Sequence, residues 1–214
     1  MPRFEFHVHS NHSKDGLDSV EKLLKQAMSL GLDGIAITDH DTISGAIEAL
    51  ELMEKQDLPI LVIPGIEVST KEGHLLVLGI REAIPPALDV KETIKIARKL
   101  NGLIIAPHPG DILRRSLKSV ENLDIDAIEA FNSKPFASSK FAEKIAVKQK
   151  LPIVAGSDAH SAELLGYAVT EIECELGERS VLQAIKAGRT RAAGKKIPLR
   201  LHLKQWARKR LQKK

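Results

Sequence analysis

The sequence has a single cysteine, Cys174, among its 214 residues. One thiol cannot form a disulfide within the chain, and it cannot supply the cysteine pairs of a structural zinc site. No apolar run approaches the ~20 residues that a membrane-spanning helix requires. The first ten residues, MPRFEFHVHS, also lack the long apolar stretch of a signal peptide. We therefore expect a cytoplasmic protein with no membrane span.

Acidic residues are absent from the C-terminal part of the sequence. Residues 195–214 carry nine Lys and Arg and no Asp or Glu, whereas the whole chain has 32 basic and 28 acidic residues. Residues 1–194 therefore hold 23 basic and 28 acidic residues, a net charge of −5, although the formal net charge of the chain is +4. We interpret residues 1–194 as one catalytic domain and residues 195–214 as a basic tail.

The tail has a helical apolar pattern. Leu199, Leu203 and Trp206 are spaced by four and three residues after Pro198, which predicts a short basic amphipathic helix. Two roles fit this pattern. The apolar side of the helix could dock on the domain while the cations face solvent. Alternatively, the cations could guide a polyanion such as nucleic acid toward the domain.

Short apolar runs alternate with amphipathic segments along residues 1–194. Helical periodicity predicts helices over 19–30, 43–56, 90–100, 137–150 and 178–187. Strands are predicted at RFEFHV, GIAIT, PILVIP, LLVLGI, LIIAP, AIEAF, PIVAG and YAVTEI. LLVLGI follows the preceding strand without a helix, so we expect a hairpin or an extra strand there. Asp18 and Asp89 are expected as helix N-caps. About seven βα repeats favour an α/β barrel over an open sheet.

Histidines and carboxylates recur where the predicted strands end. His7 and His9 end the first strand, and similar residues follow GIAIT, PILVIP, LIIAP and PIVAG. Because the C-terminal ends of barrel strands share one face, these side chains should converge there. His74 is an exception, since it begins an apolar run, but it can reach the same site if LLVLGI pairs with the preceding strand. The candidate metal ligands are His7, His9, Asp15, His40, Glu67, His74, His108, Asp158 and His160.

The donor set indicates a metal site without thiolate ligands. Imidazole nitrogen together with carboxylate oxygen suits Zn²⁺, Mn²⁺ or Fe²⁺ and does not choose among them. Nine donors exceed what one ion uses, so they predict two to three divalent ions. Each motif alone has a simpler explanation, because strand-end histidines are common and Asp39 could cap the next helix. Their coincidence at several strand ends favours the metal site.

Five segments resemble, in order, the motifs of the polymerase-and-histidinol-phosphatase (PHP) family: HVHSNHSKDG, AITDHDT, GIEVS with GHLLVLG, APHPG, and GSDAH. The resemblance covers about residues 4–194. It implies a distorted (βα)7 barrel similar to a TIM barrel, with a trinuclear metal centre at the C-terminal strand ends that hydrolyses phosphate esters. By this resemblance Glu67 bridges two ions, and the ligands divide into three sets: His7, His9, Glu67 and Asp158; Glu67, His74 and His108; Asp15, His40 and His160.

We therefore expect a phosphoesterase that cleaves a phosphate ester through a metal-bound hydroxide. The substrate would be a nucleotide, a small phosphomonoester or an oligonucleotide. Beside Glu67, Asp39 is expected to act on catalysis, either by positioning its neighbour His40 or by handling a proton. The alternative function is a nucleic-acid-binding or scaffold protein that uses the barrel and the basic tail. Retention of the full ligand set favours catalysis.

Four residues are expected to contact the substrate. Arg114 and Arg115 come soon after His108, and Asn132 and Lys134 follow AIEAF. Their amide and cationic groups suit phosphate oxygens. For each arginine, a solvated loop explains the sequence equally well.

Overall fold

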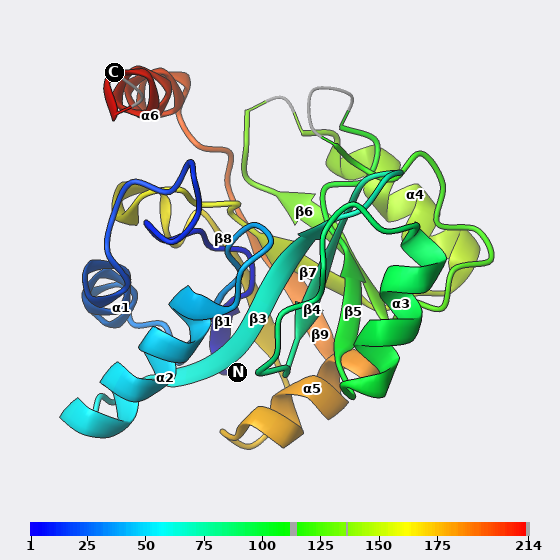
Figure 1. Cartoon of the computed structure of the whole chain (residues 1–214), viewed down its shortest axis with the longest axis horizontal. Coiled ribbons are helices and arrows are strands. Elements are labelled where there is room, and N and C mark those ends of the chain that lie inside the picture. The colour runs from blue at the N-terminus through cyan, green and yellow to red at the C-terminus, as the bar shows by residue number, and fades with distance from the viewer. Residues whose placement is uncertain (112–114, 136, 213–214) are drawn as a thin grey trace.

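A computed structural model describes residues 1–111, 115–135 and 137–212 of the chain. Within these residues nine strands form one curved sheet with helices around it (Figure 1). The strands are β1 (Arg3–Glu5), β2 (Gly34–Ile37), β3 (Leu61–Ser69), β4 (His74–Leu78), β5 (Leu103–Ala106), β6 (Ala127–Asn132), β7 (Ile153–Gly156), β8 (Ala168–Ile172) and β9 (Thr190–Gly194). The α-helices are α1 (Val20–Ser29), α2 (Ser44–Gln56), α3 (Val90–Lys99), α4 (Ser139–Gln149), α5 (Glu178–Lys186) and α6 (Leu199–Gln212), with a short 3₁₀ helix η1 at Ala162–Leu164.

The strand order is β7-β6-β5-β4-β3-β2-β1-β8-β9. Neighbours are parallel within β1–β3 and within β5–β7, whereas β4 is antiparallel to both β3 and β5. LLVLGI is thus the expected extra strand. At the other edge β8 and β9 are antiparallel, and β7 packs against both. The Thr170 hydroxyl of β8 links the two edges of the sheet, because it accepts from Ala155 N of β7 at 2.9 Å and lies 3.2 Å from Ala155 O. The sheet therefore nearly closes, which confirms the expected α/β barrel.

The predicted helices agree with α1 to α5 within about two residues. Asp89 caps α3 as expected, accepting from Lys91 N. The expectation for α1 is wrong, because Ser19 is its N-cap. Asp18 instead accepts from the backbone N–H of Ala162 at 2.9 Å. The strand β9 was not predicted, since TRAAG has no apolar alternation. No helix among the described residues is long and apolar enough to cross a bilayer.

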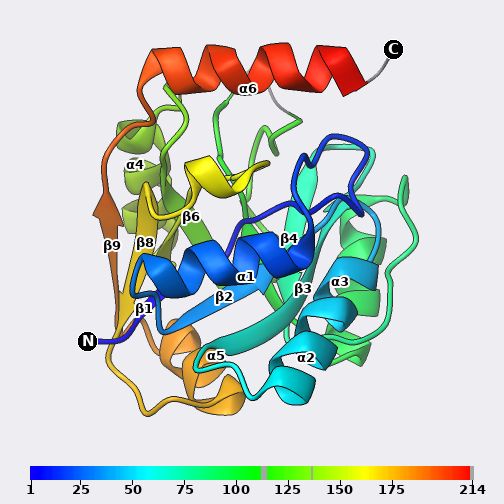
Figure 2. The same cartoon turned by 90° about the vertical axis from the view of Figure 1, so that its left-hand side faces the viewer.

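Apolar packing closes one end of the barrel and leaves the other for polar groups. Phe4 and Phe6 stack at 5.6 Å between ring centroids inside the barrel, and they belong to one buried cluster with Val181 and Ile185 of α5. Separate clusters join α1 and α2 to one part of the sheet and α3 to another. Figure 2 shows α5 at one end of the molecule and α6 across the opposite end. The C-terminal ends of the parallel strands lie at the end near α6.

The helix α6 docks through Leu201, which packs against the buried cluster around α1 and α2, and not through the three apolar residues that the sequence pattern singles out. Leu199, Leu203 and Trp206 are 51%, 54% and 51% exposed, whereas Gln205 is buried. The guanidinium of Arg210 lies 3.7 Å from the centroid of the Trp206 ring. The expected docking through Leu199, Leu203 and Trp206 with outward cations is therefore wrong, because the side of α6 that faces the barrel carries Leu201, Gln205 and Lys209.

Candidate metal centre

The nine expected metal ligands meet at the end of the barrel opposite α5. Their potential ligand atoms form four overlapping groups, each with all atoms within 4.8 Å of one another. The groups are His9, Asp15, His40 and His160; His7, His9 and Asp158; His7, Glu67 and His108; and His40, Glu67 and His74. The sheet explains how His74 joins them. Antiparallel pairing sets His74 opposite Ser69, two residues from Glu67, so both side chains point to the same face.

Glu67 lies at the centre of the site and is 1% exposed. Its two oxygens face five imidazole rings. Oε1 lies 3.0 Å from His74 Nδ1 and 3.2 Å from His108 Nε2. Oε2 lies 3.2–3.3 Å from ring nitrogens of His7, His9 and His40. One carboxylate therefore joins two sets of nitrogen donors, one set on each oxygen.

A third set of contacts forms around His160. Its Nε2 lies 2.8 Å from Asp15 Oδ2, and its Nδ1 lies 3.2 Å from Asp158 Oδ1. Asp158 Oδ1 is also 3.5 Å from His9 Nε2. The ring of His9 stacks between those of His160 and His40, with centroid distances of 4.2 and 4.5 Å. His9 thus connects the Glu67 contacts to the Asp15 and Asp158 contacts.

Several buried donor atoms in this cluster fit a cation better than they fit each other. His7 Nε2, His9 Nε2, His40 Nδ1 and Asp15 Oδ1 are buried and have no hydrogen bond to any residue in the described parts of the chain. For the three imidazoles, Glu67 Oε2 lies 3.2–3.3 Å away without forming a hydrogen bond. Two ligands held about 2.1 Å from one tetrahedral ion are about 3.4 Å apart. The donor set therefore fits divalent ions.

The pKa values of the buried histidines and of Glu67 depend on one another. Burial alone lowers the pKa of His7, but the charges of Glu67, Glu129 and Asp158 raise it well above its ordinary value. The pKa of His9 is raised to about 8 against the effect of burial, mainly through Asp158 and Glu67. Burial raises the pKa of Glu67, yet the surrounding histidines hold it well below the usual range. Buried carboxylate needs positive charge here, and bound cations would supply it while leaving the imidazoles neutral.

Glu129 on β6 supports the cluster from behind and was missed by the sequence analysis. Its Oε1 lies 2.9 Å from His7 Nδ1, and its Oε2 accepts from His108 N at 2.7 Å. Asn132 Nδ2 donates to the same Oε2 at 2.9 Å. An imidazole whose Nδ1–H is held by a carboxylate presents Nε2 as a ligand. The available signal was an acid inside the apolar run AIEAF, since an acid is rarely buried without partners.

Asp39 holds the first loop and does not line the cavity. Its Oδ1 accepts from Ser10 N at 2.6 Å and from Ser13 Oγ at 2.8 Å, and its Oδ2 accepts from Ser10 Oγ at 2.6 Å. Ser13 Oγ in turn accepts from His40 N at 2.8 Å. Asp39 is thus linked to the backbone of His40 through Ser13, and its part in catalysis stays a prediction.

The site opens into a cavity of about 320 Å³. Two expected substrate contacts line it, Arg115 and Lys134, and the Lys134 Nζ lies 3.7 Å from Asp158 Oδ1. Asn132 does not line it, because its side chain is turned to Glu129. Arg114 lies outside the described residues. A further cation, Lys209 of α6, lines the cavity and was not predicted.

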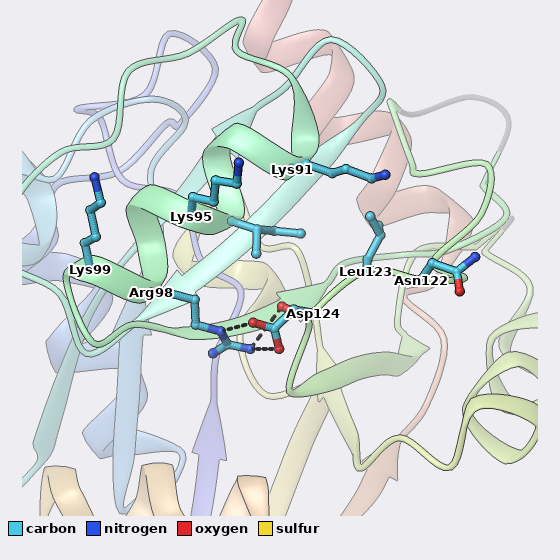
Figure 3. A pocket seen from close by; sticks show the side chains of 8 residues that line it. Lys91, Lys95, Arg98, Lys99, Asn122, Leu123 and Asp124 are labelled. Carbon is cyan, nitrogen blue, oxygen red and sulfur yellow. Dashed lines mark hydrogen bonds and ion pairs between the residues drawn. The ribbon is translucent and has the colours of Figure 1, made fainter.

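A second hollow lies away from these ligands, between α3 and the segment 122–124 (Figure 3). Lys91, Lys95 and Lys99 follow one side of α3 there. The guanidinium of Arg98 is already held by Asp124, with Nε donating to Oδ2 at 2.9 Å. None of the nine expected ligands lines this hollow, so the cavity at the barrel end is the better candidate site.

Two family models match the chain, the PHP domain over residues 5–96 and the PHP-associated segment over residues 138–190. Protein MJ1587 of Methanocaldococcus jannaschii is 36% identical over 140 residues, which cover 60% of this chain and 81% of that protein. The chain belongs to the PHP family. The barrel and the ordered motifs are therefore those of a PHP protein, as the resemblance in the sequence implied.

One of the relatives is named for a phosphodiesterase activity. The phosphoribosyl 1,2-cyclic phosphate 1,2-diphosphodiesterase of Eggerthella lenta is 41% identical over 87 residues, 38% of this chain and 32% of that enzyme. A structure from Bacteroides vulgatus, described as a two-domain protein containing a predicted PHP-like metal-dependent phosphoesterase, aligns with a TM-score of 0.79 at 22% identity. It covers 91% of this chain and 65% of that one. The chain thus spans a third of the enzyme and about two thirds of the two-domain protein.

Proposed function

We propose that this PHP protein hydrolyses a phosphate ester, with two to three divalent ions held by the nine ligands and with Glu67 bridging two of them. The observation that carries the proposal is the position of Glu67, whose oxygens separately face two histidines and three histidines. A carboxylate that only formed ion pairs would not need five imidazoles around it. The phosphodiesterase relative supports the same class of reaction.

The division of ligands is proposed as the family resemblance implies it. His74 and His108 share one oxygen of Glu67, which supports placing them on the same ion. His7, His9 and Asp158 form one of the compact groups, and Asp15, His40 and His160 occur together in another. When bound, the ions polarise the phosphoryl group and activate water for attack. Zn²⁺, Mn²⁺ and Fe²⁺ all suit this set of nitrogen and oxygen donors.

The chain's own residues would bind and orient the substrate. Arg115 and Lys134 bring positive charge to the cavity wall, where they can neutralise phosphoryl oxygens. Glu129 holds His7 with Nε2 toward Glu67, and Asp39 holds the loop that carries Ser13. Buried supports of this kind keep the reacting groups in place without reorganisation during the reaction.

The bridging role is tested by Glu67→Gln. An amide has the shape of the carboxylate but lacks its charge, and it cannot bridge two cations with comparable strength. We expect hydrolysis of p-nitrophenyl phosphate and bis(p-nitrophenyl) phosphate to fall by about 100-fold or more, as when a group acting on the transition state is lost. Metal content should fall in parallel, and circular dichroism should show a retained fold. Activity within threefold of the wild type would contradict the bridging role.

The matched control is Glu171→Gln on β8. Glu171 pairs with Arg191 on the outer surface of the barrel and has no contact with the ligand set in the described structure. This variant should keep both its metal and its activity. If Glu171→Gln lost as much metal and activity as Glu67→Gln, the effect of Glu67→Gln would not be specific to the candidate metal centre.

A further inference from the structure

The helix α6 pairs three of its cations with carboxylates of the barrel, and one of these pairs lies at the candidate metal centre. Lys204 Nζ donates to Glu163 Oε1 at 2.8 Å, and Arg208 Nη2 lies 3.5 Å from Asp18 Oδ1. Lys209 Nζ donates to Asp15 Oδ2 at 2.9 Å. Figure 2 shows the helix lying across this end of the molecule. Three cations of one helix thus reach three different acids of the barrel.

These contacts contribute little to stability, because partly exposed ion pairs in water are weak. Leu201 packs against the barrel, but Leu203 and Trp206 of the same helix are about half exposed. A helix that leaves most of its large apolar side chains exposed gives up much of the usual burial of an apolar stripe. A function for a cation of α6 at the cavity would explain this orientation.

Lys209 is the residue in that position. Among the described residues of α6 it alone lines the cavity, together with Arg115 and Lys134. The three cations come from three separate segments, and they line the same cavity as His40, His74 and Glu67. The partner of Lys209, Asp15, also contacts His160, so the ammonium lies at the edge of the ligand set.

We propose that Lys209 is a phosphate-binding residue of this site, so that α6 is part of the substrate-binding wall. The inference rests on the proposed function and adds a third cationic substrate contact to Arg115 and Lys134. An ammonium has three donors on a flexible stem, and Asp15 accepts only one of them. Lys209 can therefore keep its contact with Asp15 while donating to a phosphoryl oxygen of an anionic ester in the cavity.

The chain offers a matched control on the same helix. Lys204 and Lys209 both pair with a barrel carboxylate, at 2.8 and 2.9 Å, but only Lys209 lines the cavity. The test compares Lys209→Ala, Lys209→Arg and Lys204→Ala in full-length protein loaded with metal. The measurements are the dissociation constant of inorganic phosphate, by calorimetry, and the metal content of each variant.

Lys209→Ala should bind inorganic phosphate about 10-fold more weakly, the effect of one lost hydrogen bond to a charged group. Lys209→Arg should restore binding to within threefold, Lys204→Ala should match the wild type, and all variants should retain their metal. Unchanged phosphate binding in Lys209→Ala would overturn the proposal. Equal losses in the Lys204 and Lys209 alanine variants, or loss of metal in Lys209→Ala, would also overturn it in favour of helix docking or support of Asp15.

The two proposals fail in different ways. If the protein binds no metal and cleaves no ester in any form, the proposed function is wrong. If the wild type binds metal and hydrolyses ester but Lys209→Ala has the same affinity for phosphate, only the assignment of Lys209 is wrong.

Discussion

The variant Glu129→Gln tests whether a buried carboxylate behind the candidate metal centre controls the affinity of that centre for metal. In the wild type, Glu129 Oε1 lies 2.9 Å from His7 Nδ1, and Oε2 accepts from His108 N and Asn132 Nδ2 at 2.7 and 2.9 Å. Three donors thus converge on an acceptor that has no proton of its own. Glutamine has the same size but replaces one oxygen by an amino group.

Neither orientation of the amide satisfies these partners. If its oxygen stays with His108 and Asn132, its amino group faces His7 Nδ1, and the ring must carry its proton on Nε2, which then cannot bind metal. If the amide is reversed, its amino group meets the donors of His108 and Asn132 in a buried space. Buried donors left without acceptors cost about 1–3 kcal/mol.

We therefore expect Glu129→Gln to bind metal about 10- to 100-fold more weakly, the usual effect of losing a carboxylate behind a ligating histidine. This corresponds to about 1.4–2.7 kcal/mol of binding free energy. The assay is a titration of metal-free protein with Zn²⁺ or Mn²⁺ in competition with a chromogenic chelator, with Glu171→Gln as the control. Affinity within threefold of the wild type in a folded Glu129→Gln variant would refute the role of Glu129 in fixing His7.

Two further predictions concern stability. Removing metal with a chelator should lower the melting temperature by about 5–11 °C for each ion removed, because one ion at 100 times its Kd adds about 2.7 kcal/mol and each kcal/mol shifts Tm by about 2–4 °C in a domain of this size. A calorimetric Tm unaffected by metal would contradict the site. Burial raises the pKa of Asp18, but hydrogen bonds from Lys22 and from Ala162 N lower it overall. Its stabilising contribution is therefore present above the unfolded pKa of about 3.9 and is lost as the pH falls through the lower folded value. Asp18→Asn should reduce the free energy of unfolding by about 1–2 kcal/mol at pH 7. The variant should also lose less of this free energy than the wild type between pH 5 and pH 3. Urea denaturation that gives parallel pH curves for the two proteins would count against this role of Asp18.

The sequence predicts which side chains converge at the barrel end, because barrel topology makes that task simple. Residues at the C-terminal ends of parallel strands must share one face, so His7 and His108 can be placed together without knowing any distance. His74 could be included only on the condition that its strand pairs with the preceding one, and β3 and β4 do pair in that way. Which nitrogens share an oxygen of Glu67 depends on side-chain rotation, which strand patterns do not determine.

Supporting residues are harder to predict because their partners are distant in the sequence. Glu129 reaches His7 across 122 positions, and the run AIEAF reveals only that an acid lies within a buried strand. The N-cap of α1 was misplaced by one residue for a related reason. Asp18 and Ser19 are both good caps, and the choice between them depends on Ala162, which draws Asp18 away from the helix.

The helix α6 leaves Leu199, Leu203 and Trp206 about half exposed and turns cations toward the barrel, and the charge of the two parts of the chain explains why. Residues 1–194 carry a net charge of −5, whereas residues 195–214 carry nine cations and no acid. Asp15, Asp18 and Glu163 form part of the rim of the barrel end, and each is paired with a cation of α6. An anionic substrate approaching that rim would otherwise meet uncompensated carboxylates. Neutralising them with a helix that also brings Lys209 to the cavity makes the local field favourable where the phosphate must enter, although the barrel as a whole is acidic. Under the proposal for Lys209, the basic segment belongs to the substrate site. Its composition alone, with cations on every side of the helix, could not have shown which of them faces inward.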